Sequence, residues 1–245
     1  MTYNIWNYSQ QWAQRRPLIA QLIKEQNPDV VALQETRHDF RYERGRGQGE
    51  QLADLTGYHA TSIVAQVYVP LPRVDEGLTV LTRQPPEDVV SRELTLLKHE
   101  RHDENHRACL GVKLDGENGP VFVFDAHFSL SPVARLSNAR EAAAFIQEVA
   151  RDRPAFLMGD LNAEPHEESI ASLLGGDDLF LDCWTALHED DPGYTYASFG
   201  AVRRIDYVLA RNLSGLPHDA HVVGGKAHDG VFPSDHMAIV LDVLV

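Results

Sequence analysis

Residues 156–165, Phe-Leu-Met-Gly-Asp-Leu-Asn-Ala-Glu-Pro, are the stretch that decides the fold. The apolar run over 155–158 predicts a short buried strand, after which Gly159 relaxes the backbone. Asp160 and Asn162 follow two positions apart, so both side chains can point into one cleft. Asp160 can accept a proton or hold a cation, and Asn162 can orient a water or a phosphoryl oxygen without titrating. Because an Asp-x-Asn after a strand also forms turns, the stretch alone leaves a turn and a functional site equally open.

Length and composition describe an ordinary globular chain. Its 245 residues are 43% hydrophobic and 24% charged, which is ample for a buried core. The net charge of -14 repels polyanions at long range and argues against tight, nonspecific binding to duplex nucleic acid. No repeat, low-complexity tract or linker interrupts the sequence, so we expect a single domain over residues 1–245.

The cysteine content and the N-terminal sequence give expectations about the cellular compartment. Cys109 and Cys183 lie in apolar contexts and are too few for a disulfide scaffold, so we expect reduced core residues. The sequence contains neither a signal peptide nor a long apolar run, which predicts a cytoplasmic protein without a membrane segment. A longer native N-terminus or a removed leader stays open, because only three residues precede Asn4.

The start of the chain predicts a strand, helix, strand unit. Residues 1–6 predict a short strand that carries Asn4. Residues 16–27 place apolar side chains on one helical face, with Pro17 suited to the first turn. Residues 29–35 predict a buried strand that ends in a carboxylate, so both strands of the unit carry polar groups.

Three segments follow before the middle of the chain. Residues 37–50 are rich in Gly and Arg and predict a mobile loop, for which a solvated role is favoured over substrate contact. Residues 76–83 predict a strand. Residues 97–106 carry three histidines that could mimic a metal cluster, but no apolar frame positions them, so we expect a surface segment.

The second half alternates predicted strands and helices. Residues 107–114 and 120–127 predict a strand pair across a Gly-containing turn. The second of these strands is continuously apolar, as in a strand covered on both faces. Helices are predicted over 134–150 and 167–174, and further strands over 203–210 and 232–245.

Polar side chains recur at or near the ends of six predicted strands. Their carboxylate and amide oxygens, with no Cys ligand, suit a hard cation such as Mg2+ or Mn2+ rather than a structural zinc. Two histidines with nearby acids suit phosphoryl transfer, in which a charged group is stabilised and a leaving oxygen is neutralised. The residues are Asn4, Glu35, His127, Asp160 with Asn162, Asp206, and Asp235 with His236.

With this ordered set the sequence resembles the endonuclease/exonuclease/phosphatase superfamily. Each motif is weak alone, but they occur in the family's order over nearly the whole chain. The resemblance implies an α/β fold, a four-layer αββα sandwich of two packed mixed β-sheets flanked by helices, with the site at one edge of the sheets. It also implies a divalent-metal-dependent hydrolase of phosphoester bonds. The motifs are Thr2-Tyr-Asn4-Ile5, Leu33-Gln-Glu35-Thr36, Glu76-Gly-Leu-Thr-Val-Leu-Thr-Arg83, Asp125-Ala-His127-Phe128, Gly159-Asp160-Leu-Asn162, Arg204-Ile-Asp206-Tyr207 and Ser234-Asp235-His236.

The resemblance implies a metal site and residues that position and activate the attacking water. Glu35, with help from Asn4 and Asp235, would hold Mg2+ or Mn2+. Asp160 would orient or deprotonate the attacking water. Asn162 would hold that water or a phosphoryl oxygen.

It also implies two histidines on the phosphate. His236, steadied by Asp206, would stabilise the negative transition state. His127 would form a second phosphate contact, with Glu76 holding its other nitrogen. Arg107 resembles a phosphate-contacting arginine of the deoxyribonuclease branch. The plain alternatives are that Asp206 caps a turn and that His127 is a satisfied core histidine.

Charge favours a small phosphomonoester or phosphodiester as substrate. A nuclease acting on single strands is the main alternative, and a noncatalytic binding protein on the same fold is disfavoured because the key acids and His236 are present. Residues 68–72 make a poor hairpin for membrane contact, and no protein partner is implied. The basic patch available for nucleic acid is limited to Arg41, Arg44, Arg46, Arg203 and Arg204.

Overall fold

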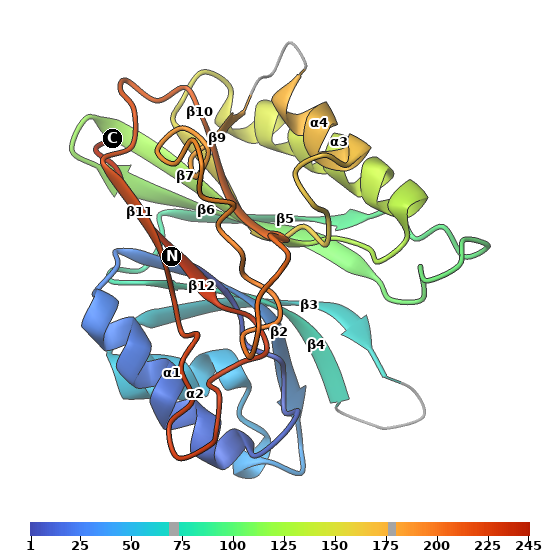
Figure 1. Cartoon of the computed structure of the whole chain (residues 1–245), viewed down its shortest axis with the longest axis vertical. Helices are drawn as coiled ribbons and strands as arrows, with labels where there is room; N and C mark the ends of the chain where they lie inside the picture. The colour runs from blue at the N-terminus through green and yellow to red at the C-terminus, as the bar shows by residue number, and fades with distance from the viewer. Residues whose placement is uncertain (69–73, 176–179) are drawn as a thin grey trace.

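Two six-stranded mixed sheets pack against each other, with helices on both outer faces (Figure 1). The structure is a computed structural model that describes residues 1–68, 74–175 and 180–245, without the side chain of Glu43. Helices α1 and α2 cover one sheet, and α3 and α4 cover the other. The predicted four-layer αββα sandwich is therefore confirmed. Of the stretch considered for membrane contact, only Tyr68 lies within the described residues.

The first sheet combines the start and the end of the chain. Its strand order is β11-β12-β1-β2-β4-β3. Strand β1 pairs in parallel with β2 and antiparallel with β12, which brings the end of β1 beside the start of β12. The strands are β1 (Thr2–Asn4), β2 (Val30–Asp39), β3 (His59–Val67), β4 (Val74–Thr82), β11 (Asp219–Val223) and β12 (Ala238–Asp242).

The second sheet comes from the middle of the chain. Its order is β5-β6-β7-β8-β10-β9. The predicted strand pair forms β6 and β7, and β7 runs parallel to β8. The strands are β5 (Asp88–Leu94), β6 (Arg107–Gly116), β7 (Gly119–His127), β8 (Ala155–Asp160), β9 (Leu181–Asp182) and β10 (Asp206–Arg211).

The four helices enclose the sandwich. They are α1 (Trp12–Gln26), α2 (Gln48–Thr56), α3 (Pro132–Ala150) and α4 (Glu168–Leu174). Helix α1 begins four residues earlier than residue 16, so the prediction that Pro17 occupies the first turn is wrong. The carbonyl of Ala13 loses its helical partner at Pro17, but both residues are exposed, so water can satisfy it.

The prediction of a loop over 37–50 is also largely wrong. Strand β2 continues to Asp39, a short 3-10 turn follows over Glu43–Gly45, and α2 starts at Gln48. The buried Asp39 carboxylate accepts hydrogen bonds from Arg41, which orders the strand end. A Gly-rich sequence hid these elements because it has low propensity for both strand and helix.

The layer between the sheets is apolar and continuous. Side chains of β2 and β4 meet side chains of β6, β7, β8 and β10 in one cluster. Cys109 and Cys183 are free and buried, as expected. The histidines at 99, 102 and 106 are exposed, as expected for a surface segment. Among the described residues, no helix is long and apolar enough to cross a membrane.

Candidate active site

Three predicted site residues lie side by side at the ends of neighbouring strands in the second sheet. The register of β7, β8 and β10 pairs His127 with Asp160 and Asp160 with Asp206. Gly159 makes this close pairing possible. Its φ is +145°, and a Cβ built there would lie 1.9 Å from the carbonyl oxygen of Ala126. A side chain at this position would push β7 and β8 apart, so glycine is required just before the key aspartate.

Glu35 enters the same region from the first sheet because β2 is irregular there. The register between β2 and β4 shifts between Leu33 and Thr36, and Glu35 has a φ of 55°. A bulge of this kind redirects a side chain out of the normal alternation of a strand. Glu35 therefore ends beside Asn4, whose side-chain nitrogen donates to Glu35 Oε1 at 3.1 Å and to Asp160 Oδ2 at 3.0 Å. One amide thus joins carboxylates from the two sheets.

Asn4 contacts the carboxylates as a donor. Its oxygen accepts a hydrogen bond from the backbone N–H of Trp6 at 3.0 Å, so in this amide orientation the oxygen faces the turn rather than the carboxylates. Asn4 was expected to help Glu35 at the metal site. The structure brings Asn4 to Glu35, where it orients the acid.

Two residues that support the surroundings of Glu35 were not predicted from the sequence. Asn7 donates from its side chain to Glu35 Oε2 at 2.8 Å. The buried guanidinium of Arg15 donates to the carbonyls of Ile5 and Pro233 at 2.8 and 2.9 Å, among others, and so ties the loop after β1 to the loop before β12. Asn7 lies three residues after Asn4 and could have been suspected, whereas an arginine on a helix carries no such signal.

His236 is held by Asp206 as expected. Its Nδ1 lies 2.9 Å from Asp206 Oδ2, and both residues are buried. Its Nε2 lies 3.7 Å from Asp160 Oδ2. The ring also packs against Tyr196, with ring centroids 4.8 Å apart, a contact that the sequence did not indicate. Because its carboxylate binds the imidazole, Asp206 is not merely a turn cap.

His127 and Asn162 meet Asp160 from the other side. His127 Nε2 lies 3.4 Å from Asp160 Oδ2. Asn162 has a φ of 52°, and its backbone N–H donates to Asp160 Oδ1 at 2.9 Å. Its side-chain nitrogen donates to the carbonyl of Phe128 at 3.0 Å, which fixes the amide beside the site.

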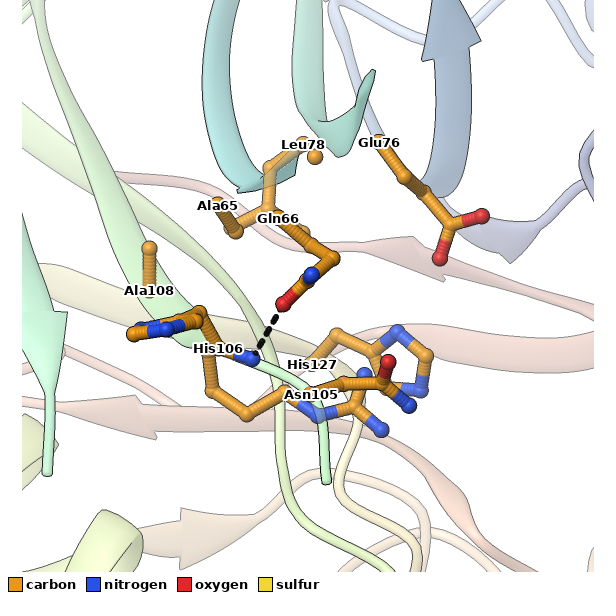
Figure 2. A pocket seen from close by; sticks show the side chains of 10 residues that line it. Ala65, Gln66, Glu76, Leu78, Asn105, His106, Ala108 and His127 are labelled. Carbon is orange, nitrogen blue, oxygen red and sulfur yellow. Dashed lines mark hydrogen bonds between the residues drawn. The ribbon is translucent and has the colours of Figure 1, made fainter. Parts of the chain in front are cut away.

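Glu76 is the clearest departure from the expected contacts. Figure 2 shows Glu76 across a small hollow from His127, and the carboxylate binds Arg37 at 2.7 Å instead. Arg37 also lies over the ring of Tyr68, 4.8 Å from its centroid. The expectation that Glu76 holds the second nitrogen of His127 is therefore not met, because Arg37, two residues after Glu35, binds the carboxylate of Glu76.

Arg107 lines the same hollow as His127. It lies at the first position of β6, and its buried Nε has no hydrogen-bond partner among the described residues. Its charge lowers the pKa of His127. An arginine beside the site with an unused donor fits the expected contact with an anionic substrate.

Burial dominates the electrostatics of the acids. It raises the pKa of Asp160 to about 6 and that of Asp235 to about 6. Burial, reinforced by the nearby carboxylate of Glu76, also raises the pKa of Glu35. Buried acids with raised pKa values are concentrated where a cation would relieve their desolvation and mutual repulsion.

The two histidines have opposite shifts. Burial opposes the charge of His236, but the carboxylates of Asp206 and Asp160 outweigh it and raise the pKa to about 10. Burial, Arg107 and His236 together hold the pKa of His127 well below its usual range. At neutral pH the site therefore contains one imidazolium and one neutral imidazole.

The donor chemistry fits a divalent cation. Glu35 and Asp160 offer carboxylate oxygens that converge on one amide, and Asp235 lies near enough for its pKa to respond to Glu35. Asp160, Asp206 and His236 also place one possible ligand atom each within 4.8 Å of one another. Because Asp206 already binds the Nδ1 of His236, the oxygens of Glu35 and of the nearby Asp235 suit a hard cation better than those of Asp206.

Comparison with known proteins gives a family and several structural relatives. A model of the Endonuclease/Exonuclease/phosphatase family matches residues 1–236. Nocturnin of Drosophila melanogaster is 23% identical over 94% of this chain, which spans 42% of the length of that curated relative. A family protein from Leptotrichia buccalis superposes with a TM-score of 0.79 at 18% identity, covering 100% of this chain and 98% of the other. A mannosyl-6-phosphatase from Bacteroides thetaiotaomicron superposes with a TM-score of 0.73 at 18% identity, covering 98% of each chain.

Proposed function

The chain belongs to the endonuclease/exonuclease/phosphatase family, and we propose that within it the chain hydrolyses a small phosphomonoester or phosphodiester with the help of Mg2+ or Mn2+. Family membership gives hydrolase chemistry at the general level. The observation that carries the finer proposal is the convergence on Asp160. Its Oδ2 lies 3.0 Å from the Asn4 amide, 3.4 Å from His127 and 3.7 Å from His236.

Asp160 is the proposed base for the attacking water. With a pKa of about 6 it is mostly ionised at pH 7, yet it is more basic than an ordinary aspartate. The backbone N–H of Asn162 fixes Oδ1, which leaves Oδ2 as the oxygen that faces both histidines. A water held at Oδ2 would lose its proton to Asp160 as it attacks phosphorus in line with the leaving oxygen.

The histidines are the proposed ligands of the phosphoryl oxygens. The imidazolium of His236, oriented by Asp206, presents Nε2 to the developing negative charge. His127 in its neutral form can donate one further hydrogen bond without adding charge. The guanidinium of Arg107 lies beside His127 and supplies a second positive group.

Glu35 would hold the cation, with Asp235 nearby and Asn4 and Asn7 fixing the glutamate. A bound divalent cation supplies Lewis-acid stabilisation of charge on the phosphoryl and leaving oxygens. The residues around it keep Glu35 in one orientation, because both of its oxygens accept a hydrogen bond from an asparagine.

The pairing of arginines supports a small substrate over nucleic acid. Most of the basic patch considered for phosphate backbones is engaged within the protein: Arg41 with Asp39, Arg46 with Asp54, Arg203 with Glu164 and Arg204 with Asp182. The net charge of -14 adds long-range repulsion. The mannosyl-6-phosphatase among the structural relatives further supports a phosphomonoester.

A substrate panel tests the proposal. Bis-p-nitrophenyl phosphate, p-nitrophenyl phosphate, a plasmid and a single-stranded oligonucleotide are incubated with and without Mg2+ or Mn2+, with His236→Ala as the blank. We expect metal-dependent hydrolysis of at least one small ester and intact nucleic acids. Cleaved oligonucleotide would favour the nuclease alternative, and no turnover of any substrate would contradict the proposal.

A further inference from the structure

Arg15 on α1 is a buried arginine whose guanidinium lies among the backbone carbonyl groups of the loop between β1 and α1. It is 1% exposed, and all three of its nitrogens donate hydrogen bonds. The guanidinium carbon also lies 5.3 Å and 5.4 Å from the ring centroids of Trp6 and Trp12. None of these hydrogen bonds goes to a carboxylate. The accepting carbonyls, at 2.6 to 3.2 Å, belong to Ile5, Trp6, Asn7, Ser9, Gln10 and Pro233.

The loop depends on such an anchor because parts of its backbone are unfavourable. Trp6, Asn7 and Gln10 have φ values of 56°, 34° and 46°. Residues other than glycine adopt this left-handed region at a cost, because Cβ approaches a backbone oxygen. The guanidinium accepts the role of donor to all three of their carbonyls, which would otherwise need other partners. Arg15 therefore stabilises a loop shape that the loop residues alone do not favour.

Asn7 connects this anchor to Glu35. Arg15 Nη2 donates to the carbonyl of Asn7 at 2.7 Å, and the side-chain nitrogen of Asn7 donates to Glu35 Oε2 at 2.8 Å. Arg15 Nη1 donates to the carbonyl of Pro233 at 2.9 Å, two residues before Asp235. One rigid planar group thus sets the position of Asn7 relative to the segment that carries Asp235.

The charge of Arg15 gives an effect of the opposite sign. Burial lowers the pKa of Arg15 to about 10, and the carboxylates of Asp235 and Glu35 are among the groups that oppose this shift. The guanidinium is therefore charged at neutral pH and lies near enough to these acids to repel a cation. Charge alone would make Arg15 weaken cation binding, whereas its hydrogen bonds would strengthen it.

We propose that Arg15 is a positioning residue for the divalent cation: it holds Asn7 in place, and through Asn7 it keeps Glu35 oriented toward the ion. This inference rests on the proposed function of the same site. A guanidinium presents five N–H donors in one plane, whereas an ammonium presents three from a single atom. Arg15→Lys therefore keeps the charge but cannot reach carbonyls on opposite sides of the group at once.

Isothermal titration calorimetry with Mn2+ tests the proposal without any substrate. For Arg15→Lys we expect a Kd roughly 10-fold higher than for wild type, the lower end of the range for groups that orient metal ligands. Arg15→Met removes the charge as well and should also weaken binding. Unchanged affinity in Arg15→Lys, or tighter binding in Arg15→Met, would overturn the positioning role.

Folding of each variant is checked by thermal unfolding of the metal-free protein. If Arg15→Lys does not fold, the comparison is repeated in a Gln10→Gly background. Gln10 is exposed and left-handed, so glycine at this position relieves the loop without touching the acids.

A double-mutant cycle tests the connection through Asn7. Asn7→Ala should weaken Mn2+ binding by a similar factor, because it removes the hydrogen bond to Glu35. Since Arg15 acts through Asn7, the double variant should bind about as weakly as either single variant. Losses that multiply in the double variant would overturn this connection.

Arg135→Lys is the matched control. Arg135 is also a buried helix arginine that donates to backbone carbonyls, those of Ser129 and Leu130, but it lies on α3 over the other sheet. Its replacement should leave the Kd for Mn2+ unchanged. An equal loss of affinity in Arg135→Lys would show that the effect of Arg15→Lys is general destabilisation, and would overturn the positioning role.

The outcomes separate the inference from the function on which it rests. Equal Kd values for wild type and Arg15→Lys would overturn the positioning role and leave the phosphoesterase intact. A wild-type protein that binds no Mn2+ would overturn the positioning role as well. Only that result together with no turnover in the p-nitrophenyl panel would also overturn the proposed function.

Discussion

At the residue scale, Asp160 is the point on which the site converges. One of its oxygens faces Asn4, His127 and His236, and the other accepts the backbone N–H of Asn162. These four groups fix the orientation of the carboxylate, and none of them is a lysine or an arginine. The acid therefore retains basicity, with a pKa raised by burial to about 6.

Replacing Asp160 by Asn should separate catalysis from folding. The expected loss in kcat is roughly 100- to 10,000-fold, the range supplied by a positioned general base. The metal-free fold should be no less stable at pH 7, because the raised pKa means that the ionised acid is disfavoured in the folded state. Steady-state kinetics and thermal unfolding of the same preparation check both parts. Retained turnover would contradict the assigned role.

Asp206 is expected to set the charge of His236. Removing its negative charge with Asp206→Asn should lower the pKa of His236 from about 10, because this carboxylate is the largest favourable influence on the imidazolium. Imidazole NMR titration of the metal-free protein measures the shift. Asp219→Asn is the matched control, because Asp219 binds the half-exposed His221 at 2.8 Å on the edge strand β11 and should leave the pKa of His236 unchanged. A His236 pKa that does not move in Asp206→Asn would remove the proposed coupling.

At the element scale, the sequence predicted strands and helices with clear periodicity and missed those without it. The apolar run of β8 and the strand pair β6 and β7 were predictable, because continuous hydrophobic residues mark buried strands. Helix α2 was not predicted, since its start is Gly-rich and Glu50 caps the backbone of Gly47 without the usual Ser or Asp. The bulge at Glu35 was equally hidden, because pairing with β4 determines it.

The approach of β7 to β8 gives a prediction for Gly159→Ala. The added Cβ would collide with the carbonyl of Ala126, so we expect a loss of about 3 kcal/mol in the free energy of unfolding, with reduced activity. Gly215→Ala is the control, because nothing lies within 4 Å of a Cβ at that position. Chemical denaturation measures both. Equal stability of the two variants would contradict the packing account.

A buried hydrogen bond between the sheets gives a pH-dependent prediction. Gln34 donates to Asp125 Oδ1 at 2.7 Å, while Asp125 Oδ2 and Gln34 Oε1 have no partner among the described atoms. Burial raises the pKa of Asp125 well above its usual value, so the folded state keeps a proton that the unfolded chain loses above about pH 4. The contribution of Asp125 to the free energy of unfolding is therefore largest below about pH 4. It falls by about 1.4 kcal/mol per pH unit as pH rises, until the pKa of Asp125 in the folded state is reached.

Asp125→Asn should remove that dependence. The amide can donate and accept at the same positions and carries no charge. Relative to wild type, the variant should gain stability as pH rises above about 4, measured by denaturation at each pH. Parallel profiles for the two proteins would show that Asp125 is not held protonated.

At the scale of the whole molecule, the order of motifs was sufficient to predict the sandwich and the group of residues at one edge. Asn4, Glu35, Asp160, Asp206 and His236 were named from strand ends, and the structure brings them together. Contacts between side chains of distant segments could not be predicted from the sequence. Glu76 was assigned to His127 but binds Arg37. Neither the contact of Asn7 with Glu35 nor that of Tyr196 with His236 was indicated. Such contacts depend on how loops from both sheets meet.

We propose that this group of acidic side chains holds a divalent cation that phosphoester hydrolysis requires. The most direct measurement is the rate of bis-p-nitrophenyl phosphate hydrolysis after chelation and during re-addition of Mg2+ or Mn2+, for wild type and Glu35→Gln. Glu35→Gln keeps the size of the side chain but removes its charge. We predict that chelation abolishes wild-type turnover, that added metal restores it, and that Glu35→Gln needs at least tenfold more metal for half-maximal rate. Full wild-type activity after chelation would show that hydrolysis needs no cation, and identical metal dependence of the two proteins would show that Glu35 does not hold it.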